Sequence, residues 1–197
     1  MEFENEITVE LDTNLEKTKE YLEKLNFKIK EEYIVKDIYM VKKDIKETSN
    51  YLDMLKNCVL IRSIITDNEE INLITYKYKE YNENKEIIKQ AKANCKVYNV
   101  QDAKRILECI GYVELIRIND SLIVYSNGED EFVLQNVNGK HIYLEIEEKC
   151  NYINKVYKSI DEMKEVIKKY NILVKSEDYF VKKAEIELIE KYGKKEK

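Results

Sequence analysis

The sequence has no proline and no tryptophan, and only one histidine, four cysteines and four glycines among its 197 residues. The cysteines are widely spaced without a CxxC pair, and His141 is the sole histidine, so a zinc site or a Cys–His or Ser–His nucleophilic site is not expected. Four glycines are too few for a phosphate-binding glycine loop, and the motifs GxxxxGK(S/T), GxGxxG, HExxH and GxSxG do not occur. Any phosphate bound by this chain is therefore expected to be bound by side chains.

Charged residues of both signs are abundant, with 34 Lys and Arg against 39 Asp and Glu and a net charge of −5. This balance does not favour a nucleic-acid partner. No apolar run approaches the ~18–20 residues needed to span a bilayer, so no membrane partner is expected. The first twelve residues, MEFENEITVELD, are acidic and have no secretory or transit signature. We expect a cytoplasmic protein.

The first half of the chain reads as a strand, a helix and further strands. Ile7, Val9 and Leu11 alternate with polar residues, which is typical of a strand with one apolar face. Thr13 begins the sequence T-N-L-E, a capping box that predicts the start of a helix. The residues that follow predict strands at about 33–40, 59–66 and 71–77, and a charged loop over 78–90 that leads into a short helix or strand.

The second half repeats this order. A strand near residues 95–98 precedes a helix over 102–110, and Gly111 suits the left-handed position that ends a helix. Asn127-Gly128 and Asn138-Gly139 are hairpin signals between strands. The predicted strands cover residues 112–118, 122–125, 131–135 and 141–147.

The two halves also resemble each other in sequence, because Leu22-Glu-Lys-Leu-Asn-Phe27 matches Leu107-Glu-Cys-Ile-Gly-Tyr112. A strand–helix–strands unit used twice predicts an α+β fold, a closed antiparallel eight-stranded β-barrel with helices outside. A second capping box at 159–162 and a segment from Ser176 to Gly193 predict two C-terminal covering helices. We expect a single domain over residues 1–192, with barrel strands within 6–147, covering helices within 159–192 and a frayed tail at 193–197.

Carboxylates recur on one face of the first and last predicted strands. Glu6, Thr8 and Glu10 alternate with apolar residues, as do Glu145 and Glu147. A barrel with external helices would turn these carboxylates into its lumen, where their burial needs a cation or basic groups as compensation. Oxygen ligands without histidine or thiolate suit Mg²⁺ or Mn²⁺.

Basic residues in apolar strand contexts are candidate partners for a phosphate chain. Arg62, Lys77 and Arg117 each lie within a predicted hydrophobic strand. A polyphosphate with a divalent metal would explain these charges, since Arg and Lys donate strong hydrogen bonds to phosphate oxygens. The alternative remains open that they lie on a solvated face or form ion pairs across strands.

These features together resemble the CYTH family, which joins class IV adenylate cyclases, thiamine triphosphatases and inorganic triphosphatases in a triphosphate tunnel fold. The best segment, residues 134–147 (LQNVNGKHIYLEIE), is similar to the family's late D-x-V-x-G-L-G-x-F-x-E-I-E motif. The resemblance implies a nucleotide or another organic or inorganic triphosphate as ligand. It implies Mg²⁺ or Mn²⁺ held by Glu6, Glu145 and Glu147, and phosphates held by Arg62, Lys77 and Arg117.

The sequence departs from the family pattern where the family places charged residues. Thr8 and Glu10 stand at Glu and Lys positions of the first strand, Leu60 and Asn119 at basic positions, and Asn94 at a carboxylate position. Two hypotheses follow. The first is a divalent-metal-dependent enzyme, either an adenylate cyclase (a lyase) or a triphosphate hydrolase. The second is a catalytically degenerate protein that binds an organic phosphate or a protein partner without turnover.

Overall fold

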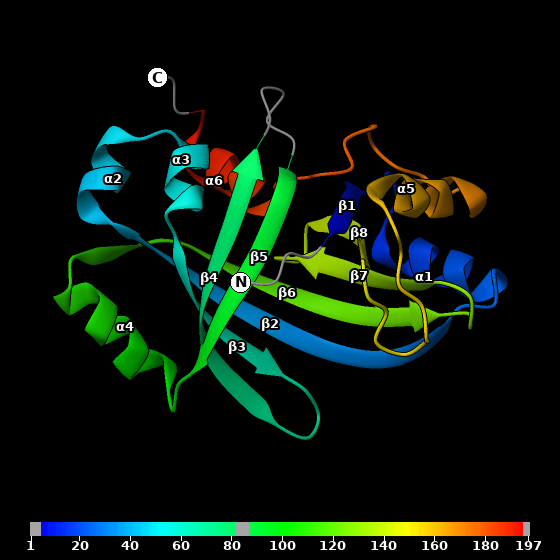
Figure 1. The fold of residues 1–197 in the computed structure, drawn as a ribbon, viewed down its shortest axis with the longest axis horizontal. Helices are drawn as coiled ribbons and strands as arrows, with labels where there is room; N and C mark the ends of the chain where they lie inside the picture. Colours follow the sequence, from blue (N-terminus) through cyan, green and yellow to red (C-terminus); the bar gives the residue numbers. More distant parts are fainter. Residues whose placement is uncertain (1–4, 82–86, 195–197) are drawn as a thin grey trace. The chain divides into compact units, whose positions relative to one another are not determined.

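The computed structural model describes residues 5–81 and 87–194, and the side chains of residues 81 and 87–90 are not described. Over the described residues the chain forms eight strands and six helices (Figure 1). Part of the loop predicted over residues 78–90, and the last three residues of the predicted frayed tail, lie outside them. The elements are β1 (Glu6–Glu10), α1 (Leu15–Lys24), β2 (Lys28–Lys42), α2 (Lys43–Thr48), α3 (Tyr51–Lys56), β3 (Val59–Ile65), β4 (Glu70–Tyr81), β5 (Ile87–Lys96), α4 (Val100–Cys109), β6 (Tyr112–Ser126), β7 (Glu131–Val137), β8 (His141–Glu147), α5 (Ile160–Lys169) and α6 (Lys183–Tyr192).

The strands form one sheet in the order β1-β8-β7-β6-β2-β3-β4-β5, and the registers described within it are antiparallel. The predicted α+β class and the eight antiparallel strands are confirmed. The chain divides into two compact units. Among the described residues, unit 1 contains residues 34–81, 87–119 and 182–194, and unit 2 contains residues 5–33 and 120–181. No helix among the described residues is long and apolar enough to cross a membrane.

Unit 2 has its hydrophobic core on one face of β1, β8 and β7. Ile7, Val9 and Ile146 are almost fully buried in this core, as the alternating pattern predicts. Helices α1 and α5 pack against the same face, with Leu22 of α1 and Met163 of α5 completely buried. Three aromatic rings pack against one another in this core: Phe27 after α1, Phe132 of β7 and Tyr170 after α5. The rings of Phe27 and Phe132 stack with their centroids 4.7 Å apart.

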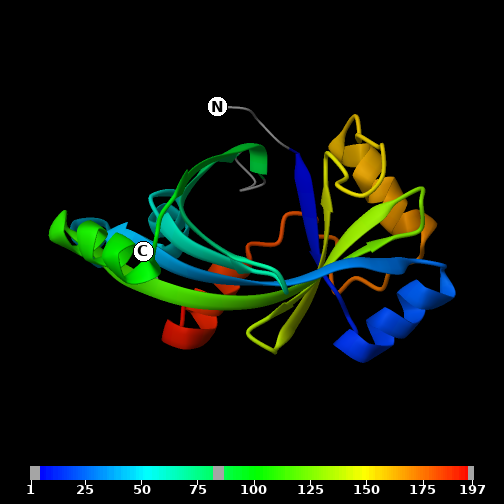
Figure 2. The ribbon, with the colours of Figure 1, turned by 90° about the horizontal axis from the view of Figure 1, so that it is seen from below.

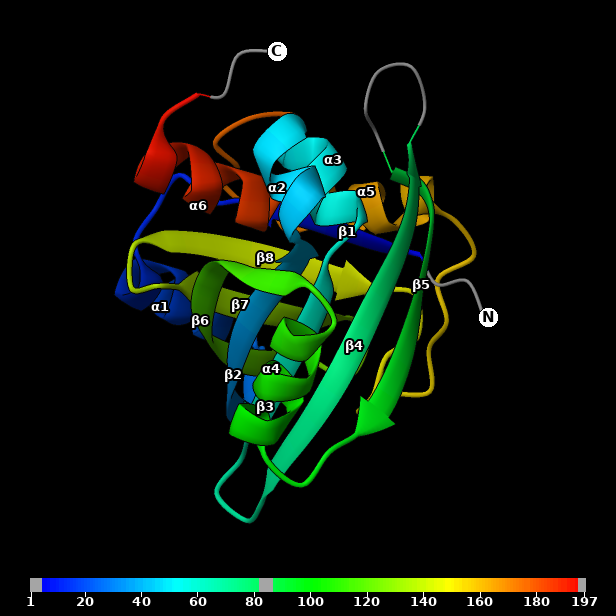
Figure 3. The same ribbon diagram turned by 90° about the vertical axis from the view of Figure 1, so that its left-hand side faces the viewer.

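Unit 1 has clusters on the two faces of its part of the sheet. Helix α4 lies over β3 and β4 (Figure 3), where Ala103 and Leu107 pack against Ile61. A second cluster joins Met54 of α3 and Leu188 of α6 to strand residues that include Leu60. Figure 2 shows β3, β4 and β5 as a strongly curved part of the sheet. The short helices α2 and α3 are not anticipated by the sequence analysis.

The segment 173–181 follows the outer edge of β1 and corrects the predicted last helix. The N–H of Thr8 donates to the carbonyl of Tyr179 at 2.9 Å, and the N–H of Val181 donates to the carbonyl of Thr8 at 3.1 Å. The N–H of Lys175 donates to the carbonyl of Glu10 at 2.8 Å. The helix expected to begin at Ser176 therefore begins only at Lys183. The edge of β1 needs backbone partners, and this long-range need overrides the helical pattern of the segment.

Other local predictions are confirmed or shifted. Asn138 and Gly139 both have positive φ, 51° and 70°, as a type I′ hairpin turn requires. The predicted repeat is confirmed at the helix ends, since Asn26 after α1 and Gly111 after α4 both have positive φ. The first helix is capped by Asn14, one residue after the predicted Thr13. The strands predicted at 112–118 and 122–125 are one continuous strand, β6, because the polar residues between them contain no Gly or Pro to end it.

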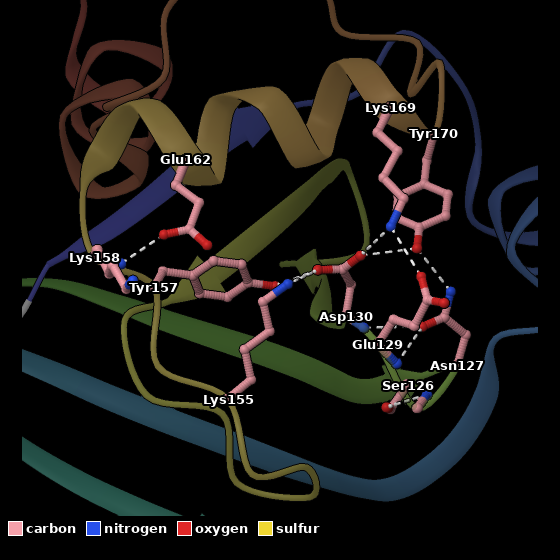
Figure 4. A network of polar contacts seen from close by, with 11 residues as sticks. Ser126, Asn127, Glu129, Asp130, Lys155, Tyr157, Lys158, Glu162, Lys169 and Tyr170 are labelled. Carbon is pink, nitrogen blue, oxygen red and sulfur yellow. Dashed lines mark hydrogen bonds and ion pairs between the residues drawn. The ribbon is translucent and has the colours of Figure 1, made fainter.

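A buried carboxylate joins the β6–β7 connection to the segment after β8 and to α5 (Figure 4). Asp130 has no exposed surface. One oxygen accepts from Lys155 and from the Tyr157 hydroxyl, and the other accepts from Lys169 at 2.9 Å and from the Tyr170 hydroxyl at 2.8 Å. Burial opposes ionisation of this carboxyl, but the four donors outweigh it and lower the pKa of Asp130 to about 2.

Replacing Asp130 with asparagine removes the charge that both lysines face. We expect Asp130→Asn to lower the free energy of unfolding by about 3 kcal/mol, at the lower end for a broken buried pair because Lys155 and Lys169 are partly exposed. Urea unfolding followed by circular dichroism measures this loss. Asp161→Asn is the control, since Asp161 is 90% exposed beside Lys164. A loss no larger than that of the control would contradict the structural role of Asp130.

The same carboxyl predicts acid sensitivity. Its pKa is about 2 in the folded protein and near 4 in an unfolded chain, so the unfolded state takes up the proton first as the pH falls. The stability that Asp130 contributes is therefore fully present above about pH 5 and is lost as the pH falls toward 2. Urea unfolding between pH 7 and pH 3 should show a shallower decline for Asp130→Asn than for the natural protein. Parallel declines would show that another group dominates acid unfolding.

Candidate functional site

The register of β1 against β8 gathers the predicted metal ligands on one face of unit 2. Glu6 lies opposite Glu147, and Thr8 lies opposite Glu145. Directly opposite residues of antiparallel strands point to the same face, so these side chains lie away from the face that carries Ile7 and Ile146. The start of this pairing is reinforced by Asn5, whose backbone and side-chain nitrogens both donate to Glu148 Oε2.

The three predicted ligands Glu6, Glu145 and Glu147 are close enough to hold one ion. Each offers a carboxylate oxygen, and these oxygens lie within 4.8 Å of one another. We call these residues the carboxylate triad. Glu145 is 9% exposed and accepts a hydrogen bond from the Thr8 hydroxyl at 3.1 Å. A set of hard oxygen donors fits Mg²⁺ or Mn²⁺ and not a soft metal.

Two neighbouring residues that the sequence analysis did not single out lie around the triad. The Asn151 side-chain nitrogen is 3.5 Å from Glu147 Oε2, a long contact. Tyr33 lies at the end of the β2 part of unit 2. Burial, and then the negative charges of Glu145 and Glu147, raise the pKa of the Tyr33 phenol far above its usual value. Tyr33 is therefore a neutral hydroxyl at physiological pH, in the electrostatic field of the triad.

Glu10, where the family has lysine, is held by two basic residues of unit 2. Its Oε1 accepts from Lys175 Nζ at 2.9 Å and lies 3.1 Å from His141 Nδ1. Burial opposes ionisation of Glu10, but the hydrogen bonds from Lys175 and His141 outweigh it and lower its pKa. Lys175 comes from the segment along β1, so no strand pattern could have identified it.

Arg62, a predicted phosphate-binding residue, forms an ion pair within unit 1. Its Nε and Nη2 bind the two oxygens of Asp37 at 2.7 and 2.6 Å. Asp37 is 6% exposed and lies opposite Arg62 in the β2–β3 register. This pair realises the cross-strand alternative that the sequence left open. Arg62 also lies opposite Leu73, four residues before Lys77, so Arg62 and Lys77 share the sheet face opposite α4.

Lys77 lies directly opposite Lys92 in the β4–β5 register. Directly opposite residues of antiparallel strands point to the same face, so the side chains of Lys77 and Lys92 share one face of the sheet. At the positions where the sequence departs from the family, Leu60 is buried in a hydrophobic cluster and Asn94 accepts from the Thr75 hydroxyl at 2.9 Å.

Arg117, the third predicted phosphate-binding residue, is bound to Glu114 on the same strand. Its Nε and Nη2 each donate to Glu114 at 2.8 Å, and the Arg117 side chain is 54% exposed. Glu114 also contacts Lys104 of α4 at 3.0 Å, so this group of ions is connected to α4. The hydrogen bond from Arg117 lowers the pKa of Glu114 to about 2 despite partial burial.

Comparison with known proteins gives relatives along nearly the whole chain. No family model matches the chain. A protein of Methanocaldococcus jannaschii named "Putative adenylate cyclase MJ0240" is 27% identical over 187 residues, which is 94% of this chain and 97% of the relative. The solved structure of protein PH1819 from Pyrococcus horikoshii OT3 matches with a TM-score of 0.63 at 16% identity, over 86% of this chain and 92% of that one. That of a putative adenylate cyclase from Vibrio parahaemolyticus matches with a TM-score of 0.54 at 13% identity, over 86% and 84%.

The Arg62–Asp37 pair predicts a measurable contribution to stability. We expect Arg62→Gln to lower the free energy of unfolding by about 3 kcal/mol, because it leaves the buried Asp37 carboxylate without its guanidinium. Asp37→Asn combined with Arg62→Gln should cost less than the sum of the single variants, and urea unfolding of all three gives the coupling. Arg117→Gln, at an exposed pair, should cost less than about 1 kcal/mol. Additive effects of the Asp37 and Arg62 variants would contradict the pairing.

Proposed function

We propose that this chain, a CYTH-like protein, binds a nucleoside triphosphate together with a divalent cation, with the carboxylate triad as the cation ligands. The observation that carries the proposal is the convergence of three carboxylate oxygens within 4.8 Å on one face of unit 2. The resemblance to CYTH proteins and the 27% identical relative, which bears the name of an adenylate cyclase, support a nucleotide ligand. Mg²⁺ and Mn²⁺ are the cations that this oxygen-only set of donors favours.

The proposed reaction is cyclisation of ATP. The ribose 3′-hydroxyl attacks the α-phosphate, a new ester bond forms, and pyrophosphate leaves as the hydroxyl proton is released. A bound divalent cation would neutralise negative charge on the phosphate oxygens. Glu6, Glu145 and Glu147 would hold that cation. The Thr8 hydroxyl orients Glu145 by donating a hydrogen bond to its carboxylate. Attack by water on the terminal phosphate would instead make the protein a triphosphate hydrolase.

The basic residues of unit 1 remain the proposed phosphate-binding residues. Arg62 and Lys77 share a sheet face, and Lys92 adds a third positive charge to it. Arg117 is the weakest of the proposed donors, since Glu114 neutralises it at an exposed position.

Binding without turnover is the second candidate function, and the ion pairs of Arg62 and Arg117 favour it. A hydrogen bond between charged groups contributes about 1.5–3 kcal/mol, so two arginines neutralised by carboxylates imply about 3–6 kcal/mol less stabilisation of a phosphate chain. This corresponds to about 10²–10⁴ in affinity or in transition-state stabilisation. Where the cation at the triad still holds the ligand, a deficit of this size in transition-state stabilisation would leave a sensor that binds an organic phosphate without turnover.

One experiment separates these functions. The protein is titrated calorimetrically with ATP and with tripolyphosphate, each with and without Mn²⁺, and the reaction products are separated by chromatography. Cyclic AMP with pyrophosphate supports the cyclase, and ADP with phosphate supports the hydrolase. Metal-dependent binding without product supports the sensor. No binding of either ligand under any condition would overturn the proposal.

The carboxylate triad predicts a specific loss of metal binding. We expect Glu145→Gln and Glu147→Gln each to weaken Mn²⁺ binding at least about tenfold, since each removes one charged ligand. Thermal stability should be unchanged or higher, because like charges at close range repel. Glu16→Gln is the matched control on the exposed surface of α1. Unchanged Mn²⁺ affinity in both triad variants would exclude the triad as the cation site.

A further inference from the structure

We propose that the loop 150–155 is a positioning element for the carboxylate triad, and that Glu131 is the residue that fixes this loop. The inference rests on the proposed function, because it assigns a role toward the same cation site. Glu131 is the first residue of β7 and is 6% exposed. It belongs to unit 2, as do the loop and the triad.

The loop is a closed structure that leaves β8 directly after the triad. Lys149 and Val156 form an antiparallel bridge. The N–H of Cys150 donates to the carbonyl of Lys155 at 3.1 Å, and the N–H of Tyr157 donates to the carbonyl of Glu148 at 2.8 Å. The loop therefore returns to its starting point within a few residues, and its first residues lie beside the end of β8, where Glu147 is located.

Glu131 holds the first residues of the loop through their backbone. Its Oε1 accepts the N–H of Asn151 at 2.7 Å, and its Oε2 accepts the N–H of Tyr152 at 2.8 Å. Both oxygens of a buried carboxylate are thus used on two consecutive backbone donors. Hydrogen bonds to an ionised acceptor are about twice as strong as neutral ones, and they also reduce the cost of burying the charge.

The position of Glu131 in the sheet makes this assignment specific. Val133 lies opposite Glu145 in the β7–β8 register. Glu131, two residues earlier, therefore shares the sheet face of Glu147, two residues after Glu145. From strand alternation alone, Glu131 would be expected to join the three carboxylates as a further cation ligand. Its hydrogen bonds to the loop instead assign it to the support of its neighbours.

The two residues that Glu131 holds, Asn151 and Tyr152, contact the triad and strand β2, respectively. Asn151 presents its side-chain nitrogen to Glu147 Oε2 at 3.5 Å, and the Tyr152 hydroxyl donates to Glu31 Oε2 at 2.7 Å. Glu31 is two residues before Tyr33 on β2. At 3.5 Å the contact with Glu147 is a weak one, and an amide in this place would limit the rotation of a carboxylate that holds a cation.

The far end of the loop is held by the preceding residue, Asp130. This carboxylate accepts from Lys155 and Tyr157, as Figure 4 shows. Two adjacent buried carboxylates at the start of β7 therefore fix the two ends of one loop. Such support is typical of the groups that orient metal ligands, whose loss weakens metal binding by about 10–100-fold.

Two variants test the inference in the metal-free and the metal-bound protein. Glu131→Gln keeps the size of the side chain but replaces one acceptor with a donor that faces a backbone N–H. Asn151→Ala removes the amide and leaves the backbone clamp in place. We expect Mn²⁺ affinity, measured by calorimetry without nucleotide, to fall about tenfold for Glu131→Gln and several-fold for Asn151→Ala. Glu129→Gln, two residues away and 74% exposed, is the matched control and should bind Mn²⁺ like the natural protein.

Amide hydrogen exchange of the metal-free protein tests the clamp separately. The amides of Asn151 and Tyr152 should exchange slowly in the natural protein and in Asn151→Ala, and at least tenfold faster in Glu131→Gln. If the natural protein binds Mn²⁺ and both variants bind it equally well, the positioning role is overturned while the proposed function stands. If the natural protein binds no Mn²⁺, the proposed function fails and the inference fails with it. Should Glu131→Gln not fold, Asn151→Ala decides.

Discussion

The antiparallel register of β1 against β8 is the constraint on which the core and the candidate site of unit 2 both depend. Ile7, Val9 and Ile146 are almost completely buried on one face, and their packing allows only one pairing of the strands. A slip of one residue would carry the carboxylates into the apolar core and the isoleucines to the other face. The energy that forms the core therefore also sets the spacing of Glu6, Glu145 and Glu147.

Three buried carboxylates of this protein are each compensated in a different way. Asp130 uses two lysines and two tyrosines, Glu131 uses two backbone N–H groups, and Asp37 uses the fork of Arg62. Each set of hydrogen bonds joins segments that are distant in sequence. The contacts that compensate the buried charges therefore also hold the tertiary structure together. For the carboxylate triad, the proposed compensation is a divalent cation, which joins groups that would otherwise repel.

The alternation of apolar and polar residues along single strands was the basis of most predictions that the structure confirms. It identified β1 and β8 and the face shared by Glu6, Glu145 and Glu147, and the Asn-Gly pair identified the turn at 138–139. Each of these features is encoded within a few residues. The pairing of Arg62 with Asp37 depends on a register between strands that no local pattern specifies. The clamp of Glu131 on the loop and the path of residues 173–181 along β1 depend likewise on partners far away in the chain. In the segment from Ser176, local propensity favours a helix, but hydrogen bonds to β1 hold the backbone beside that strand instead.

Two residues of the first strand that differ from the CYTH pattern, Thr8 and Glu10, each have a defined polar partner in the structure. Thr8 replaces a carboxylate, yet its hydroxyl remains beside the triad and donates to Glu145. Glu10 replaces a lysine, yet Lys175 places an ammonium group 2.9 Å from the Glu10 carboxylate. Glu10 is thus held in an ion pair, and its ammonium partner comes from a segment that the edge of β1 holds in place. The backbone pairing of residues 173–181 with β1 therefore also supplies the counter-charge that makes a partly buried carboxylate at position 10 compatible with the fold.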